Sequence, residues 1–205
     1  MLTLIIIAIT CIVSILCFQN QDLFMKLRFS PYMVKSKNQT YRFFTHAFVH
    51  ADWTHLLINM FVLLSFGKIV EAYFGIVFEG KATVYFILLY LGGILFSSLP
   101  AYSKHQHDYN YSAVGASGAV SAVLFSSILF DPLSGIRIMF IPIDIPAVVF
   151  GFLYLAYEAY SAKKASDNIG HDAHFWGAIY GIIITLILDY GIGIRFVEQI
   201  RGIFN

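Results

Sequence analysis

The sequence predicts an all-α integral membrane protein: a bundle of six transmembrane helices with a long membrane-associated loop between the first and second helix. Hydrophobic residues make up 59% of the 205 residues, charged residues only 12%, and the mean hydropathy is +0.74. A soluble domain usually has about a quarter of its residues charged. The apolar residues gather in long runs that leave no room for a separate soluble module.

Each apolar run is predicted to form one helix of a single domain that covers residues 1–205. The expected helices are 2–18, 55–70, 82–99, 114–130, 145–160 and 174–188, followed by a tail at 191–205. These runs are shorter than the roughly 20 residues that cross a standard hydrocarbon core. We therefore expect the helices to extend past these limits, or the bilayer to thin around them.

The first run lacks the features of a cleaved signal peptide. It begins at Leu2 with no basic segment before it, and no small-residue cleavage site precedes Gln19, so we expect a retained helix. Cys11 and Cys17 lie six residues apart in this run and would face different sides of the helix. They cannot form a disulfide there and are expected to be reduced and inert.

Residues 19–53 form a long connection that is rich in aromatic and basic residues, and we expect it to pack on or into the membrane surface. Six helices place both termini on one side of the membrane. With a cytoplasmic N-terminus, eight of the 13 basic residues would lie outside, so the charge bias slightly favours the opposite orientation. The net charge of +1 argues against nucleic acid as a partner.

Polar residues at the starts of three expected helices interrupt the apolar runs, where an unpaired polar group is costly and needs a partner or a purpose. His55 and Asn59 share one face of the second helix because they lie four residues apart. Ser117 lies in G-A-S-G at the start of the fourth helix, and His174 lies at the start of the sixth. The second, fourth and sixth helices begin on the same membrane face, so these side chains share a side and an approximate depth.

Small residues supply a means of contact between the fourth and sixth helices. Gly177 and Gly181 form a G-x-x-x-G, which allows a neighbouring helix to come close. The fourth helix has a similar surface, made by Gly115, Gly118, Ser121 and Ala122. Ser117 alone is also typical of such a crossing. If the two faces pack together, however, Ser117 and His174 can meet.

A serine next to a histidine points to nucleophilic catalysis. A neutral imidazole within hydrogen-bond reach is the usual base for a serine hydroxyl. The developing oxyanion needs donors, for which His55, Asn59 and the backbone N–H of Ser117 are candidates. No acidic residue lies in the apolar part of the second, fourth or sixth helix to complete a triad. The residues therefore predict a serine–histidine dyad without a cofactor.

These motifs together resemble the rhomboid family of intramembrane serine proteases in its minimal six-helix form, over about residues 41–181. G-A-S-G is similar to the family's G-x-S-G, with Ser117 as nucleophile, and A-H-F-W-G-A-I-Y-G to its A-H-x-x-G-x-x-x-G, with His174 as base. The run H-A-F-V-H-A-D-W-T-H-L-L-I-N resembles the family's H-x-x-x-H-x-x-x-x-H-x-x-x-N. The resemblance puts His55 and Asn59 at oxyanion positions. We expect Gly115 to be a third residue that helps to stabilise the oxyanion.

Further positions are expected to support the site. By the resemblance, His46 and His50 are mainly structural. Arg42 corresponds to the arginine of the family's Trp-Arg pair, in which this chain has tyrosine in place of tryptophan. Glu71 begins a motif similar to the family's E-x-x-x-G. The other supporting residues are Gly118, Ser121, Gly177 and Gly181.

One position departs from the family. Some rhomboids have a tyrosine four residues after the nucleophile, whose ring stacks on the histidine, whereas this chain has Ser121. We therefore take Ser121 as the candidate hydrogen-bond partner of His174. Glu158 and Asp189 fall near helix ends and are expected to be solvated, and His171 is expected in a loop.

The resemblance implies hydrolysis of peptide bonds in or near the membrane segments of single-pass transmembrane proteins. The fifth helix and the loop at residues 161–172 would act as a gate. The short chain suggests a bacterial cytoplasmic membrane, with the site opening to the extracytoplasmic face, and the oligomeric state is left open.

Two other functions are considered. A derlin-type rhomboid relative would bind clients without cutting them, but such relatives lack the serine or the histidine. A histidine-based metal or ion carrier would need acidic or cysteine ligands inside the bundle, and the sequence predicts none there. His46 and His50 in H-A-F-V-H also lack the glutamate of a zinc-protease H-E-x-x-H. No metal site is predicted.

Overall fold

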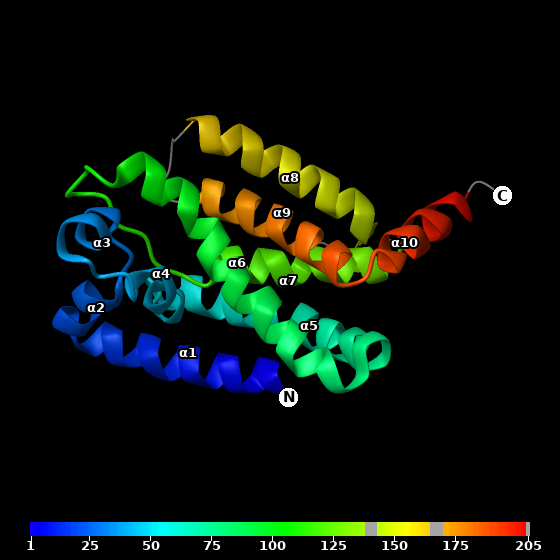
Figure 1. Cartoon of the computed structure of the whole chain (residues 1–205), viewed down its shortest axis with the longest axis horizontal. Helices are drawn as coiled ribbons and strands as arrows, with labels where there is room; N and C mark the ends of the chain where they lie inside the picture. Colours follow the sequence, from blue (N-terminus) through cyan, green and yellow to red (C-terminus); the bar gives the residue numbers. More distant parts are fainter. Residues whose placement is uncertain (138–142, 165–169, 204–205) are drawn as a thin grey trace.

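The apolar segments fold into long helices that lie side by side (Figure 1). The computed structural model describes residues 1–137, 143–164 and 170–203. The helices that match the six predicted runs are α1 (Leu2–Gln19), α5 (Trp53–Phe78), α6 (Ala82–His105), α7 (Ser117–Phe130), α8 (Ala147–Lys164) and α9 (His171–Leu188). The prediction of an all-α membrane bundle is confirmed.

Three helical stretches of the described residues are long and apolar enough to cross a membrane. They are 2–19, the continuous stretch 53–105 that contains α5 and α6, and 171–188. α7 is apolar but shorter, with 14 residues.

Two helices start later than predicted, each for a local reason. α7 starts at Ser117 and not at residue 114, because Gly115 has a φ of 116°, which no right-handed helix contains. α8 starts at Ala147 and not at residue 145, because the preceding residues belong to a strand.

α5 is longer than predicted and continues past residue 70 to Phe78. The charged Glu71, which ended the apolar run, turns toward the start of α1. There its carboxylate accepts hydrogen bonds from the backbone N–H groups of Leu2 at 2.6 Å and Thr3 at 3.2 Å. Glu71 thus caps α1, because the first N–H groups of a helix have no acceptor within it.

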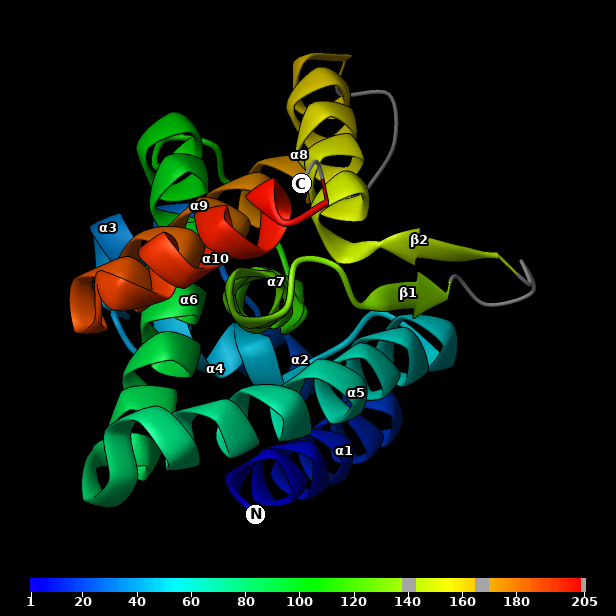
Figure 2. The same ribbon diagram turned by 90° about the vertical axis from the view of Figure 1, so that its right-hand side faces the viewer.

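α7 is the central helix of the bundle. In Figure 2 it is seen end-on, with the other long helices arranged around it. Every residue from Gly118 to Leu129 is buried, and α7 packs against α5, α6 and α9. A helix that is apolar on all sides is typical of a protein core or a membrane span.

α7 and α9 cross in direct backbone contact. A Cβ atom at Gly177 would collide with the carbonyl oxygen of Gly118, and one at Gly181 would collide with that of Ala122. The two small-residue faces therefore pack together, as the sequence predicts. The spacing of four residues on both helices means that they run in the same direction at this contact.

The long connection between α1 and α5 is folded. It contains α2 (Gln21–Leu27), α3 (Pro31–Lys37), α4 (Arg42–Thr45) and a short 3-10 helix (His46–Phe48). Phe29 and Val34 are buried against Ala101 near the end of α6. This part of the chain thus packs at one end of the bundle (Figure 1).

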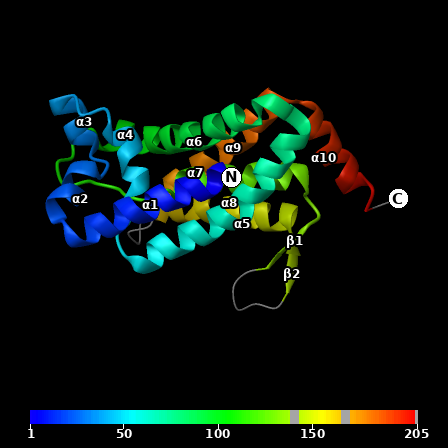
Figure 3. The ribbon, with the colours of Figure 1, turned by 90° about the horizontal axis from the view of Figure 1, so that it is seen from below.

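Besides the short helices between α1 and α5, a hairpin and a helix in the tail were not predicted. A hairpin of β1 (Gly135–Arg137) and β2 (Asp144–Pro146) connects α7 to α8 and projects from the bundle (Figure 3). Its strands are joined by two hydrogen bonds between Arg137 and Asp144, at 2.9 and 3.0 Å. The tail contains α10 (Gly191–Arg201).

Candidate active site

Ser117 is the first residue of α7 and is half-buried. The turn before it requires glycine, because the positive φ of Gly115 is rarely adopted by residues with a side chain. A Cβ atom at Gly115 would also lie 2.7 Å from the ring of His55. A larger residue there would therefore displace both the turn and His55.

The loop histidines hold the same turn from the other side. The N–H of Gly115 donates to the carbonyl oxygen of His46 at 3.0 Å, and the N–H of Ala116 donates to Nε2 of His50 at 3.5 Å. No side chain of the described residues caps the start of α7. The N–H groups of its first turn thus remain available to a developing negative charge.

His174 lies at the start of α9, beside the crossing of α7 and α9. Gly118, next to Ser117, contacts Gly177, which lies one turn after His174; a Cβ atom at Gly118 would be 3.3 Å from the carbonyl oxygen of Ala173. Ser117 and His174 thus flank a single contact. Both are described residues, and no hydrogen bond joins their side chains in this state.

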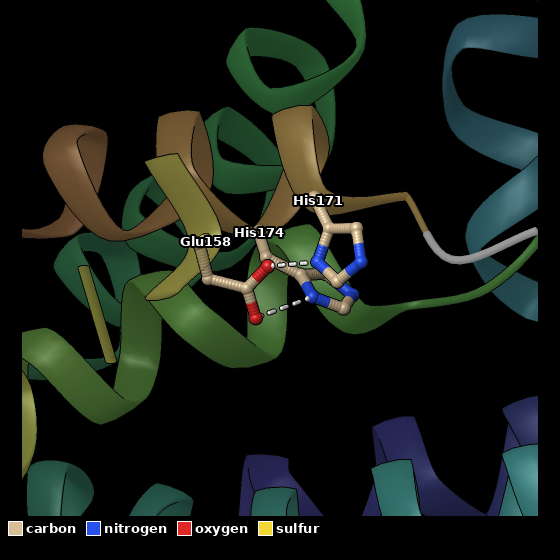
Figure 4. A group of neighbouring side chains, drawn as sticks. All are labelled: Glu158, His171 and His174. Atoms are coloured by element: carbon tan, nitrogen blue, oxygen red, sulfur yellow. Dashed lines mark hydrogen bonds and ion pairs between the residues drawn. The ribbon is translucent and has the colours of Figure 1, made fainter. Parts of the chain in front are cut away.

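Glu158 on α8 contacts two histidines of α9 (Figure 4). Its Oε1 lies 3.1 Å from Nδ1 of His174, and its Oε2 lies 2.6 Å from Nδ1 of His171. Glu158 and His171 are each 4% exposed. The expectations of a solvated Glu158 and a loop position for His171 were therefore wrong. α8 continues past Glu158 to Lys164 and turns the carboxylate inward onto α9.

The contact with Glu158 determines which nitrogen of His174 can act as a base. An ionised carboxylate only accepts hydrogen bonds, so Nδ1 of His174 must carry the proton. Nε2 then holds the lone pair, and this is the form of imidazole that can accept a proton from a hydroxyl.

The predicted oxyanion residues lie on α5 near the start of α7. His55 is half-buried, and its ring lies against Gly115 and 4.9 Å from the ring of His50. Asn59 is buried, and its amide donates to the carbonyl oxygen of His55 at 2.9 Å, within its own helix. That hydrogen bond uses one of its two N–H donors and leaves the other.

His46 and His50 have neutral hydrogen-bond partners. Nδ1 of His46 lies 3.0 Å from the carbonyl oxygen of Arg42, and Nδ1 of His50 lies 3.0 Å from Oγ of Ser14 on α1. Burial lowers the pKa of His46 to about 4 and the pKa of His50 to about 3. Both rings are therefore uncharged at neutral pH.

Two other predicted supporting residues, Arg42 and Glu71, lie in different places. Arg42 is buried and donates to the carbonyl oxygens of Met25 and Arg28 at 3.0 and 2.6 Å, which ties the loop together. Glu71 lies away from the site, at the start of α1.

The hypothesis that Ser121 is the partner of His174 is wrong. The Ser121 hydroxyl instead pairs with the hydroxyl of Tyr154 on α8 at 2.8 Å. Glu158, one turn further along α8, takes the place beside His174.

Glu158, His171 and His174 are also a candidate metal-ligand set, with ligand atoms within 4.8 Å of one another. The bundle thus contains the acidic group that the sequence did not predict there. Around tetrahedral zinc, with bonds of about 2.0–2.1 Å, neighbouring ligand atoms lie roughly 3.3 Å apart. The 2.6 Å contact to His171 is shorter and suits a hydrogen bond to an ionised carboxylate. The geometry fits a hydrogen-bonded cluster better than a metal centre.

A signal for this cluster was present in the sequence. Ala147, Gly151, Tyr154 and Glu158 recur at intervals of three and four residues, which places them on one face of α8. The two small residues indicate that this face is packed, and Glu158 continues it.

Comparison with known proteins identifies relatives. The family model described as "Rhomboid domain" matches residues 37–190. "Rhomboid-like protein 15" of Arabidopsis thaliana is 30% identical over 75% of this chain and 39% of its own length. "Presenilin-associated rhomboid-like protein, mitochondrial" of Homo sapiens is 28% identical over 66% of this chain and 34% of its own length.

The chain spans about two fifths to just over half of the length of the first four relatives. These and the human protein are plant and animal proteins, and the names of several place them in mitochondria or chloroplasts. The relatives therefore do not support the expected bacterial membrane.

Proposed function

The chain belongs to the rhomboid family, and we propose that it is an intramembrane serine endopeptidase with Ser117 as nucleophile and His174 as base. The observation that carries the proposal is the backbone contact of Gly118 with Gly177, which places the starts of α7 and α9 together. The family match supports the same assignment.

The reaction follows from the chemistry of the two side chains. Nε2 of His174 accepts the proton of Ser117 as Oγ attacks the substrate carbonyl carbon, and the same proton then passes to the leaving amine. The side chain of Ser117 must first turn into hydrogen-bond reach of His174, a contact that is often loose in the absence of substrate. Water hydrolyses the resulting acyl-enzyme.

The oxyanion of the tetrahedral intermediate would lie at the start of α7. The N–H groups of the first turn are not capped there, and the ring of His55 and the amide of Asn59 are on the adjacent helix. Donors that are already in place stabilise this charge at little cost in reorganisation.

The length of α7 supports a site below the membrane surface. Its 14 residues extend about 21 Å, whereas a hydrocarbon core is roughly 30 Å thick. Ser117 would therefore lie inside the bilayer boundary, where a membrane-embedded peptide bond can reach it. We propose single-pass transmembrane proteins as substrates.

Membrane location and gating are part of the same proposal. In it, the site of this multi-pass membrane protein opens to the extracytoplasmic face. In the proposed gate, residues 161–164 and 171–172 belong to α8 and α9, and residues 165–169 lie outside the described chain.

The test is proteolysis in liposomes. Purified chain and the Ser117→Ala variant are reconstituted with a panel of single-pass proteins whose membrane segments contain Gly or Pro, and fragments are identified by mass spectrometry. We expect cleavage within or next to the membrane segment by the wild type alone. If both forms bind panel proteins but neither cuts them, the result would instead support a client-binding protein. Cleavage that persists in Ser117→Ala would refute the assigned nucleophile.

A further inference from the structure

The carboxylate of Glu158 is buried, and burial disfavours a charge. α8 buries only Ala147, Gly151 and Glu158 among its described residues. A buried carboxylate is costly unless it is paired and hydrogen-bonded. The two imidazoles of α9 supply that pairing, one for each carboxylate oxygen.

We propose that Glu158 is the positioning residue for the base of the proposed protease. Through Nδ1 it fixes the tautomer and the ring orientation of His174, so that Nε2 faces the reaction. His171 holds the other carboxylate oxygen at 2.6 Å and so fixes the direction in which Glu158 points. The inference rests on the proposed roles of Ser117 and His174 and replaces the predicted dyad with a serine–histidine–glutamate arrangement.

The proton balance assigns Glu158 no proton transfer of its own. The proton of Ser117 moves to Nε2 of His174, and the ring becomes a cation whose Nδ1–H remains bonded to the carboxylate. The negative charge of Glu158 stabilises this cation, and the proton leaves from Nε2 to the amine. Glu158 stays ionised throughout.

The position of Glu158 also makes the base depend on a third helix. Ser117 and His174 lie on α7 and α9, which touch through their backbones, whereas Glu158 reaches His174 from α8. In Figure 1, α8 lies along the outer side of α9. Any displacement of α8 away from α9 would therefore release the ring of His174 while leaving the nucleophile in place.

The first experiment measures the tautomer directly, without any need for activity. Protein with ¹⁵N-labelled histidine is studied by NMR in detergent, and His174→Ala identifies the His174 signals. We expect the proton on Nδ1 in the wild type, and a shift to the Nε2–H tautomer, whole or partial, in Glu158→Ala. A wild-type ring protonated on Nε2, or a ring unchanged in Glu158→Ala, would overturn the proposal.

The second experiment measures how fast a fluorophosphonate probe labels Ser117. Glu158→Ala and the isosteric Glu158→Gln are expected to lower the maximal labelling rate by about 10²- to 10⁴-fold, with the apparent probe affinity within about threefold of wild type. The matched control is Asp189→Asn, since Asp189 is a half-exposed carboxylate at the far end of α9, paired with Arg195 at 3.1 Å. Its labelling rate should stay within about twofold of wild type.

The outcomes separate the two proposals. Glu158→Gln that folds, as shown by its thermal unfolding, and labels at the wild-type rate would remove the role of Glu158 and leave the protease intact. A wild type that shows the Nδ1–H tautomer but is never labelled would refute the protease, while the orientation of His174 by Glu158 would stand.

Discussion

Two pairs of histidines flank the start of α7, three of them buried and His174 half-buried, and their surroundings give them different chemistry. His46 and His50, in the loop before α5, face a carbonyl oxygen and a hydroxyl, and both are neutral. His171 and His174, on α9, face the carboxylate of Glu158. Histidine side chains are thus neutral and support the fold in the first pair, whereas in the second pair they can carry a positive charge.

The two pairs also act on different halves of the site. The backbone carbonyl oxygen of His46 and the ring of His50 hold the turn that presents Ser117, because they accept hydrogen bonds from the N–H groups of Gly115 and Ala116. The α9 pair holds the base. Removal of a loop histidine should therefore affect stability first, and removal of His174 should affect the reaction.

The largest expected effect separates the pairs by activity. His174→Ala should lower the fluorophosphonate labelling rate of Ser117 by about 10³-fold or more, because no base remains to accept the proton of the hydroxyl. His50→Ala should instead lower the stability by about 1–3 kcal/mol, because it leaves buried partners unpaired. Labelling kinetics and thermal unfolding of both variants check this. If His174→Ala is labelled as fast as wild type, the two histidine pairs do not differ in their effect on the reaction.

The next effect separates the pairs by pH. Below about pH 6.5 the unfolded chain binds protons at His46 and His50, whereas the folded chain does not until its pKa values of about 4 and about 3. The unfolded state then holds more protons, so stability falls as the pH falls. Between pH 6.5 and 4.5 each histidine should cost about 2 kcal/mol.

Denaturant unfolding in detergent across this range tests the pH effect. The comparison is between wild type and His50→Gln, whose stability should fall less steeply on acidification. Parallel curves for the two proteins would mean that His50 titrates normally in the folded state.

A smaller effect tests the backbone contact that places the α9 pair. Gly177→Ala should destabilise the protein by about 1–3 kcal/mol, because the new methyl group collides with the carbonyl oxygen of Gly118. The control is Gly75→Ala in α5, where nothing lies within 4 Å and helix propensity should give up to about 1 kcal/mol of stabilisation. Thermal unfolding measures both, and a tolerated Gly177→Ala would contradict the close crossing.

The smallest effect concerns Ser121, which the structure assigns to Tyr154 and not to either histidine pair. Ser121→Ala should cost about 1 kcal/mol of stability for the lost hydrogen bond. The His174 tautomer, read by the same NMR experiment, should stay on Nδ1. A changed tautomer would return Ser121 to the role predicted from the sequence.

The sequence predicted the parts of the site that depend on local spacing. Gly177 and Gly181 indicated a close crossing, and the starts of the second, fourth and sixth helices placed His55, Ser117 and His174 on one side. Hydropathy also identified every long helix. Such signals lie within single helices, so a pattern can contain them.

The sequence did not distinguish Glu158 from Asp189, since both end an apolar run. Their difference depends on which helix lies opposite: α9 turns two imidazoles toward Glu158, whereas Asp189 lies beside Arg195. Likewise, the start of α7 depends on the φ of Gly115, and the hairpin depends on the pairing of β1 with β2. These features arise from contacts between segments and are not visible in a run of letters.

The most direct measurement is the site of fluorophosphonate labelling in folded, detergent-solubilised protein. The predicted result is one adduct on Ser117, identified by mass spectrometry, that is absent in Ser117→Ala and strongly reduced in His174→Ala. Folded wild-type protein that takes up no label, or labels equally in His174→Ala, would contradict an activated serine. G-A-S-G would then be a helix-packing motif.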